Sequence, residues 1–104
     1  MSVVLTQIDG AVATVTVNRP EALNAINGAV LDALESAFAE VEANPAVGAA
    51  VLTGAGGKAF VAGADIKEMQ SFGAEEARQF SARGHAVFAM MERSRLVWIA
   101  AVEG

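Results

Sequence analysis

The chain has 104 residues, of which 54% are hydrophobic and 18% charged, so it holds the core of one small domain and is neither a two-domain enzyme nor a disordered tail. Seven basic and twelve acidic residues give a net charge of −5, which disfavours nucleic acid as a partner and leaves any anionic ligand to a local cluster of donors. Cysteine is absent and histidine occurs once, so we expect neither disulfides nor a metal site.

The beginning of the chain predicts a β-hairpin. Two runs rich in β-branched residues flank Asp9-Gly10, a pair that tolerates the positive φ angles of a type I′ turn. Between residues 11 and 17 apolar residues alternate with threonine and valine, so one face of the second strand is expected to be buried. Arg19-Pro20 ends this strand, because proline donates no hydrogen bond to a ladder.

A helix and a buried strand are expected next. Asn27 is suited to cap the helix, and Asn44-Pro45 ends it. The uncharged run from Val47 to Thr53 predicts a buried strand, which the turn at Gly54–Gly57 ends. The stripe of the helix that faces the sheet is expected to consist of Val30, Leu31, Leu34, Phe38 and Val41.

The second half of the chain repeats this pattern. Asp65 and Glu68 have the spacing of a capping box, which predicts a helix start, and a longer helix is expected over about 74–93. Leu96–Val102 is predicted to be another buried strand. Because such a strand needs neighbours on both sides, we expect the fold to continue downstream or in partner subunits. The order of elements favours a layered α/β or α+β domain.

Nothing in the sequence predicts export or insertion into a membrane. The N-terminus lacks a basic stretch followed by a long apolar run, so we expect no secretory signal and a cytoplasmic location. Leu96–Val102, the apolar stretch near the end, is far shorter than the roughly 20 residues of a membrane-spanning helix. A membrane partner is therefore not expected.

Residues Gly54–Ala59 fit the GxGxxA spacing of a dinucleotide-binding turn, but their context does not. That fingerprint requires a full helix directly afterwards and an acidic residue about 20 positions on, at the end of a second strand. The residues that follow, Phe60–Gly63, are too few to form that helix, because glycine interrupts them at position 63. A phosphate-binding P-loop fails as well, because its spacing is wrong and no Ser or Thr follows Lys58. We interpret this stretch as a turn.

The backbone of Ala62–Lys67 is the stronger candidate for chemistry. Small residues allow another molecule to approach the main chain closely, and Gly63 frees the backbone angles. Amide groups just ahead of a helix lack intrahelical partners and carry partial positive charge, so they can stabilise an oxyanion. From the residues alone, an ordinary tight strand-to-helix turn remains the alternative.

The segment FVAGADIKEM, preceded by VTVNRPEALNAIN and AAVLTGAGGKAF, closely resembles the N-terminal half of the enoyl-CoA hydratase (crotonase) family. The resemblance covers almost the whole chain, and the two motifs NRPEALNA and KAFVAGADIKEM are specific in this order and at this separation. It implies an α/β fold of the crotonase type, a spiral of ββα units, here incomplete, with residues 1–104 as the N-terminal part of one domain. It also implies assembly into trimers or dimers of trimers.

The resemblance assigns roles to particular residues. The backbone N–H of Ala64 corresponds to the first oxyanion-hole amide, which polarises the thioester carbonyl of an acyl-CoA. Arg19 or Lys67 is expected near the phosphates of coenzyme A. The residues that the resemblance implies along the acyl-CoA groove are Leu23, Ala25, Ala62, Ala64, Asp65, Ile66 and Lys67.

The implied activity is hydration of a 2-enoyl-CoA thioester, with coenzyme A as part of the substrate and no separate cofactor. The second oxyanion amide and the glutamates that activate water are expected beyond Gly104, so we predict that the chain alone is inactive. Glu103 stands where the family commonly has Asn and is not expected to be one of these glutamates. The alternatives are another reaction of the family, such as isomerisation or thioester hydrolysis, and a non-catalytic CoA-binding or assembly module.

Overall fold

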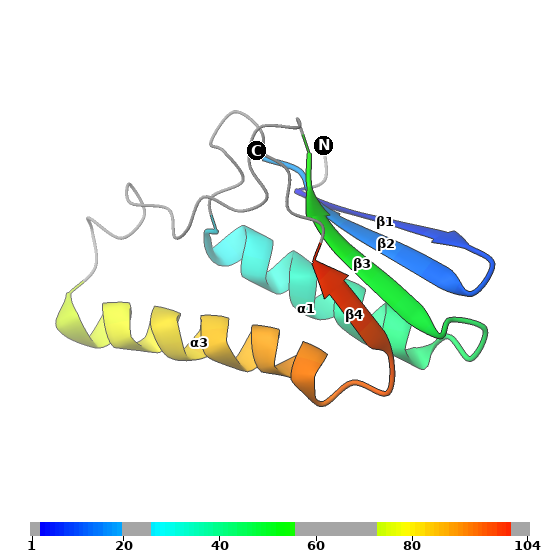
Figure 1. Ribbon diagram of the computed structural model, residues 1–104. Helices are drawn as coiled ribbons and strands as arrows, with labels where there is room; N and C mark the ends of the chain where they lie inside the picture. Colours follow the sequence, from blue (N-terminus) through cyan, green and yellow to red (C-terminus); the bar gives the residue numbers. More distant parts are fainter. Residues whose placement is uncertain (1–2, 20–25, 56–72, 101–104) are drawn as a thin grey trace.

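The computed structural model describes residues 3–19, 26–55 and 73–100, which form a four-stranded sheet with two helices packed on one face (Figure 1). The strands lie in the order β1-β2-β3-β4; β1 and β2 are antiparallel, and the other two neighbouring pairs are parallel. The elements are β1 (Val4–Asp9), β2 (Val12–Val17), α1 (Gly28–Ala43), β3 (Ala49–Gly54), α3 (Ala74–Glu92) and β4 (Val97–Ala100).

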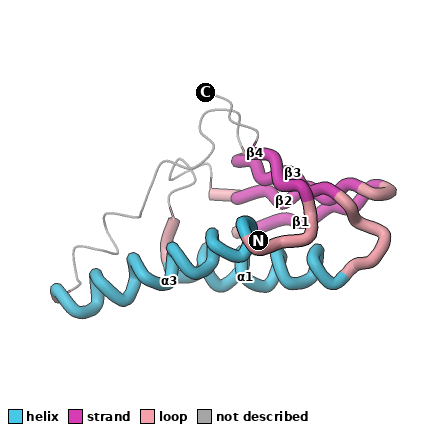
Figure 2. Tube along the Cα trace, turned by 60° about the horizontal axis from the view of Figure 1, so that its bottom comes forward, coloured by secondary structure: helices cyan, strands magenta, loops and turns pink. Residues whose placement is uncertain are grey.

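The two helices lie on the same side of the sheet because of the way the strands are connected. One helix lies between β2 and β3 and the other between β3 and β4, and each crossover adds its strand in the same direction along the sheet. Right-handed crossovers that advance in one direction place successive helices on one face. Figure 2 shows α1 and α3 together on one side of the strands. The fold is a mixed α/β layer structure, as the sequence predicts.

The hairpin is present, but its turn lies one residue later than predicted. Asp9 pairs with Val12, so the two residues that join the strands are Gly10 and Ala11. Gly10 has a φ of 62°, a left-handed conformation that glycine adopts without steric cost. The alternation in β2 is confirmed, and its buried face consists of Ala13, Val15 and Val17.

Helix α1 begins and ends where the sequence predicts. The side chain of Asn27 accepts a hydrogen bond from the backbone N–H of Val30 at 2.9 Å, which satisfies one of the donors that the first turn leaves free. Asn44 follows the last turn, with Pro45 directly after it. The buried stripe contains all the predicted residues and one more, and it consists of Val30, Leu31, Leu34, Ala37, Phe38 and Val41.

Aromatic contacts around Phe38 join α3 and β4 to α1. The ring of Phe38 lies edge-to-face with Trp98 at a centroid distance of 4.9 Å and with Phe88 at 6.5 Å. Helix α3 is less buried than α1, because Val87 is its one buried residue, while Phe80 and Phe88 are partly buried against the core.

The prediction of a fully buried last strand is wrong for one of its two faces. The described strand β4 is shorter than predicted and lies at the edge of the sheet, beside β3 alone. Val97 and Ile99 are 63% and 54% exposed, whereas Trp98 packs on Phe38. The apolar residues of this run predict burial on both faces of the strand, but the two described helices cover only one face of the sheet.

The side chain of Arg95 fastens the end of α1 to the start of β4. Its guanidinium donates to the carbonyl oxygens of Glu42, Asn44 and Val47 at 2.9, 2.7 and 2.9 Å. A cation is favourable at this end of a helix, because the last carbonyl groups lack partners and carry partial negative charge. The Glu42 carboxylate forms an ion pair with the Arg95 side chain at 3.4 Å from Nε. It also accepts hydrogen bonds from the backbone N–H of Arg95 at 3.3 Å and from the hydroxyl of Ser94.

We expect Leu34→Ala to lower the free energy of unfolding by about 2–5 kcal/mol, because Leu34 is 0% exposed and its removal leaves a cavity between α1 and the sheet. Leu5→Ala is the matched control, since Leu5 is 43% exposed and loses few contacts. Urea denaturation followed by circular dichroism measures both. An equal loss for the two variants would contradict the assignment of the core.

Arg95→Met keeps the aliphatic stem of the side chain and removes its donors, so three backbone carbonyls lose their charged partner. We expect a loss of about 1–3 kcal/mol in the free energy of unfolding. Arg78→Met serves as the control, because Arg78 is 77% exposed and pairs with Glu75 one turn earlier in the same helix. If Arg78→Met is as destabilising as Arg95→Met, the role given to Arg95 is wrong.

Candidate functional site

The residues that the sequence predicts to bind acyl-CoA lie outside the described part of the chain. They fall in two segments, 20–25 and 56–72, and they are Leu23, Ala25, Ala62, Ala64, Asp65, Ile66 and Lys67. Their predicted roles therefore remain predictions. The structure does describe the points at which the chain enters and leaves these two segments, and these points define where a site could form.

Both segments begin at the same edge of the sheet. β2 and β3 are parallel neighbours, and their last residues, Val17 and Gly54, are partners in the register. The backbone N–H of Ala55 donates to the carbonyl of Val17 at 2.8 Å, which extends the pairing just past the end of β3. In open α/β sheets, ligands bind in the crevice outside the carboxyl ends of the strands. This edge is therefore the candidate site.

Arg19 also lies at this edge. It is two residues past the end of β2 and is half-buried. Its position is compatible with the role that the resemblance implies, because a guanidinium at the carboxyl edge can reach an anionic group bound there. The other predicted partner of the coenzyme A phosphates, Lys67, lies outside the described residues.

The first segment returns into a fixed helix N-terminus. Ile26 packs against the core, and Asn27 caps α1 as described above. Residues 20–25 are therefore held at both ends, by β2 on one side and by the capped first turn of α1 on the other. A short segment with fixed ends is suited to present backbone and small side chains to a ligand.

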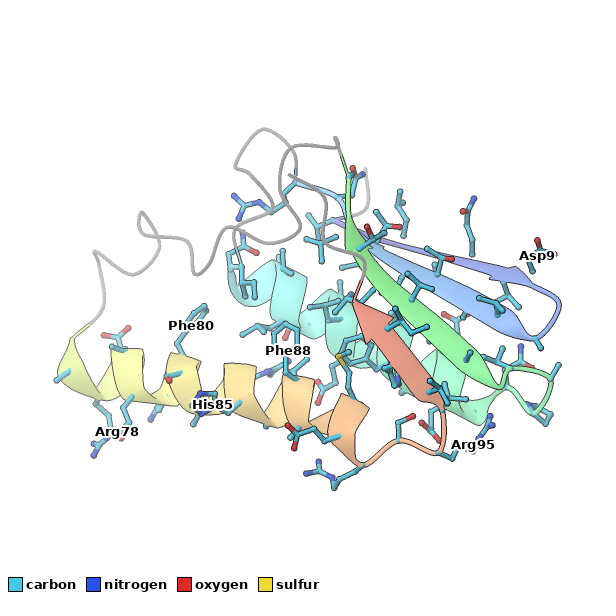
Figure 3. All side chains as sticks on the ribbon, viewed as in Figure 1. Asp9, Arg78, Phe80, His85, Phe88 and Arg95 are labelled. Atoms are coloured by element: carbon cyan, nitrogen blue, oxygen red, sulfur yellow. The ribbon has the colours of Figure 1, made fainter. Side chains whose placement is uncertain are left out.

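The second segment ends at the N-terminus of α3, which lies against α1. The backbone N–H of Gly73 donates to the Glu76 carboxylate at 3.3 Å at the first turn of α3. Further along α3, the Arg83 guanidinium donates to Asp32 at 2.6 Å and to Glu35 at 3.1 Å on α1. Figure 3 shows Phe80 rising from the side of α3 that bears Phe88, with Arg78 on the opposite side.

A cavity of about 320 Å³ lies between the first halves of α1 and α3. It borders residue 28, three positions after the first segment, and residue 76, four positions after the second. The lining residues are Gly28, Leu31, Asp32, Glu76, Gln79, Phe80 and Arg83. The sequence did not predict the Arg83 contacts in this region, because Asp32 and Glu35 are 51 and 48 residues away from Arg83.

A second cavity, of about 450 Å³, lies at the other end of the helices. It is bordered by the last turns of α1 and α3 and by β4, so it lies away from the carboxyl edge. Its lining includes Trp98, whose indole N–H is buried without an acceptor, and Glu42, whose carboxylate is engaged by Ser94 and Arg95.

The described residues contain no obvious catalytic group for acid–base chemistry. Every described carboxylate lies on α1, on α3 or at the end of β1 in the hairpin. The described residues also contain no group of three or more residues of the types that bind metals.

Among the described helices, none has the length and hydrophobicity needed to cross a membrane. His85 is exposed on α3.

Comparison with known proteins agrees with the resemblance. The model of the enoyl-CoA hydratase/isomerase family matches residues 7–104. A short-chain-enoyl-CoA hydratase from Clostridium acetobutylicum is 46% identical over 101 residues, which are 97% of this chain and 39% of that protein. A crotonyl-CoA hydratase from Syntrophomonas wolfei is 46% identical over 92 residues, covering 88% of this chain and 35% of its own length.

Solved structures show the same relationship. The fold matches the crystal structure of an enoyl-CoA hydratase from Bacillus anthracis with a TM-score of 0.94 and 28% identity, over 98% of this chain and 40% of that one. An enoyl-CoA hydratase from Thermoplasma volcanium matches with a TM-score of 0.93 and 32% identity, over 100% and 41% of the two chains. The chain thus spans about two fifths of the length of these relatives.

The order and direction of the strands agree with the solved structures, and the family model matches residues 7–104. This chain therefore belongs to the enoyl-CoA hydratase/isomerase (crotonase) family and forms part of its α/β fold.

Proposed function

We propose that this chain is the acyl-CoA-binding part of an enoyl-CoA hydratase. The observation that carries the proposal is the family match, because it includes the whole of both predicted motifs, NRPEALNA and KAFVAGADIKEM. The shared edge from which residues 20–25 and 56–72 depart supports it, since both motifs follow strands that end side by side. The names of the two curated relatives favour a short 2-enoyl thioester as substrate.

In the proposed reaction, water adds across the double bond between C2 and C3 of the acyl group. As the oxygen of water bonds to C3, water gives up a proton to a base and the electron pair of the double bond moves toward the thioester. The carbonyl oxygen takes on negative charge as an enolate. The backbone N–H of Ala64 stabilises this charge, and C2 is then protonated. Removing one such donor in other enzymes costs about 2.7–4 kcal/mol of transition-state stabilisation.

A non-catalytic CoA-binding or assembly module is the second candidate. It is favoured by the distribution of carboxylates, because in the described part of the chain they lie on helix surfaces and at the hairpin rather than at the carboxyl edge. Hydration requires a positioned base to activate water. We therefore propose that the 104-residue chain binds acyl-CoA and does not hydrate it.

We also propose a cytoplasmic location, on the ground of the N-terminal sequence. By analogy with the family, we propose coenzyme A as part of the substrate without a separate cofactor or metal, and a homo-oligomer of three or six subunits for the complete enzyme. We propose no role for nucleic acid or a membrane, since the chain has a net charge of −5.

Calorimetric titration of the chain with crotonyl-CoA tests the proposal. We expect saturable binding and no heat with NADH, which carries a similar adenine and pyrophosphate. Lys67→Gln is expected to weaken binding, and Arg78→Gln, which removes one positive charge at an exposed position of α3, serves as its control. A chain that does not bind crotonyl-CoA would refute the assignment of an acyl-CoA site.

The same samples test whether the chain is inactive. We expect the ultraviolet absorbance of the enoyl thioester to remain constant in the presence of the chain, while a complete relative consumes it. Loss of absorbance with the purified 104-residue chain would show that the catalytic groups lie within it and would exclude the non-catalytic module.

The role of the Ala64 N–H is tested by two substitutions. Ala64→Pro removes the N–H, whereas Ala64→Gly keeps it, and the readout is the ¹³C resonance of the thioester carbonyl in bound butyryl-CoA. A donor that polarises the carbonyl moves this resonance downfield, so we expect the shift in the wild type and in Ala64→Gly and its loss in Ala64→Pro. An unchanged shift in Ala64→Pro would exclude Ala64 as the donor.

A further inference from the structure

The two halves of α3 are held against the rest of the structure in different ways. The second half packs through apolar side chains: Val87 is 1% exposed, and the centroid of the Phe88 ring lies 6.5 Å from that of Phe38 on α1. In the first half, residues 74–83, most side chains are exposed and Phe80 is partly buried. The first turns also extend past the start of α1 (Figure 1). The first half therefore depends more on individual contacts than the second half does.

Arg83 provides an ionic contact from this first half to α1. Its guanidinium donates to the Asp32 carboxylate at 2.6 Å and to the Glu35 carboxylate at 3.1 Å. The two carboxylates are three positions apart, so they lie on one face of α1 and share the same cation. The Arg83 side chain is 40% exposed, against 77% for Arg78, whose partner Glu75 is on its own helix. A network of three charges that joins two helices holds them more firmly than a single surface ion pair does.

This contact lies beside the candidate site. Asp32 and Arg83 both line the cavity of about 320 Å³ between the first halves of the two helices, so the contact between them limits how far the cavity can open. Helix α3 begins at Ala74, two positions after the segment 56–72 that carries the predicted oxyanion residue Ala64. Because the chain is continuous, a displacement of the first half of α3 displaces the end of that segment.

We propose that Arg83 is a positioning residue for acyl-CoA binding, because it holds the first half of α3 on α1 and thereby fixes the end of segment 56–72. This role, which rests on the proposed function, belongs to a residue outside both predicted motifs. Exposed ion pairs contribute little to the stability of a whole fold, so the effect of this contact is local. Its loss lowers the fraction of chains in which the site is formed, and the apparent affinity falls with that fraction.

Hydrogen exchange of the free chain tests the contact without a ligand. In Arg83→Met we expect the backbone amides of residues 77–83 to exchange about two to five times faster than in the wild type, while those near Val87 keep their rates. Asp32→Asn/Glu35→Gln, which removes the partners on α1, is expected to speed up the same amides of α3. Circular dichroism checks that each variant keeps its helices.

Calorimetric titration with crotonyl-CoA separates positioning from charge. Asp32→Asn/Glu35→Gln removes two negative charges, so general electrostatics predicts tighter binding of the polyanion, whereas loss of positioning predicts weaker binding. We expect the Kd to rise about two- to fivefold in this pair and in Arg83→Met. Arg83→Lys keeps a cation and is expected to bind more tightly than Arg83→Met. The control, Glu40→Gln/Glu92→Gln, removes two negative charges at other exposed helix positions and is expected not to weaken binding.

The outcomes distinguish this role from the proposed function. If the wild type binds crotonyl-CoA and Arg83→Met binds it equally well, the role of Arg83 is wrong and the acyl-CoA site stands. Tighter binding by Asp32→Asn/Glu35→Gln would also overturn the role, because charge alone would then explain the result. Unchanged exchange of residues 77–83 in both variants would show that the contact does not hold α3. A wild type that fails to bind would refute the proposed function itself, and the role of Arg83 with it.

Discussion

The fold depends on the packing of one face of the sheet against the apolar stripe of α1. The residues of β2 and β3 that point toward the helices have small or medium side chains, such as Ala13, Val15 and Ala50, and this allows α1 to lie close to the strands. The stripe contributes larger residues, including Leu34 and Phe38, that fill the space between the layers. Because α1 is the crossover between β2 and β3, this one contact fixes the parallel pairing, and the parallel pairing fixes where both strands end.

The position of the candidate site follows from that pairing. Val17 and Gly54 are partners in the register, so the segments after them leave the sheet side by side, although 37 positions separate the two residues in the sequence. The first segment then enters a capped helix at Asn27 and the second enters α3 at Gly73. Loops on a rigid scaffold can hold backbone groups in place for a ligand, and here the scaffold is described on both sides of each loop. At the opposite end, Arg95 ties α1 to the start of β4, which keeps the two helices in a fixed relation to the sheet.

Local signals in the sequence predicted most of the fold. Asn27 and Asn44-Pro45 have chemistry that acts within a few residues, and the helix between them has the predicted bounds. The hairpin turn lies one residue later than predicted, because Asp9 pairs with Val12 and the turn consists of Gly10, with its positive φ, and Ala11. The burial of β4 could not be predicted, since it depends on which faces other elements cover and not on its own apolar residues.

Contacts such as Arg83 with Asp32 join distant parts of the chain and leave no local pattern in the sequence. The site residues were predicted by resemblance, and their positions remain outside the described structure.

The distribution of basic residues is consistent with the proposed binding of a polyanion at one edge of an acidic chain. Four of the seven basic residues lie on α3 or between α3 and β4. Three of these four have structural partners: Arg78 pairs with Glu75, Arg83 bridges to α1, and Arg95 binds the carbonyls at the end of α1. The other three, Arg19, Lys58 and Lys67, all follow the carboxyl ends of β2 and β3 in the sequence. A net charge of −5 provides no general attraction for coenzyme A phosphates, so binding has to rest on donors concentrated where the ligand lies. The same reasoning applies to the thioester in the proposed function, because a backbone N–H, the role proposed for Ala64, would supply a partial positive charge without adding a side chain to the site.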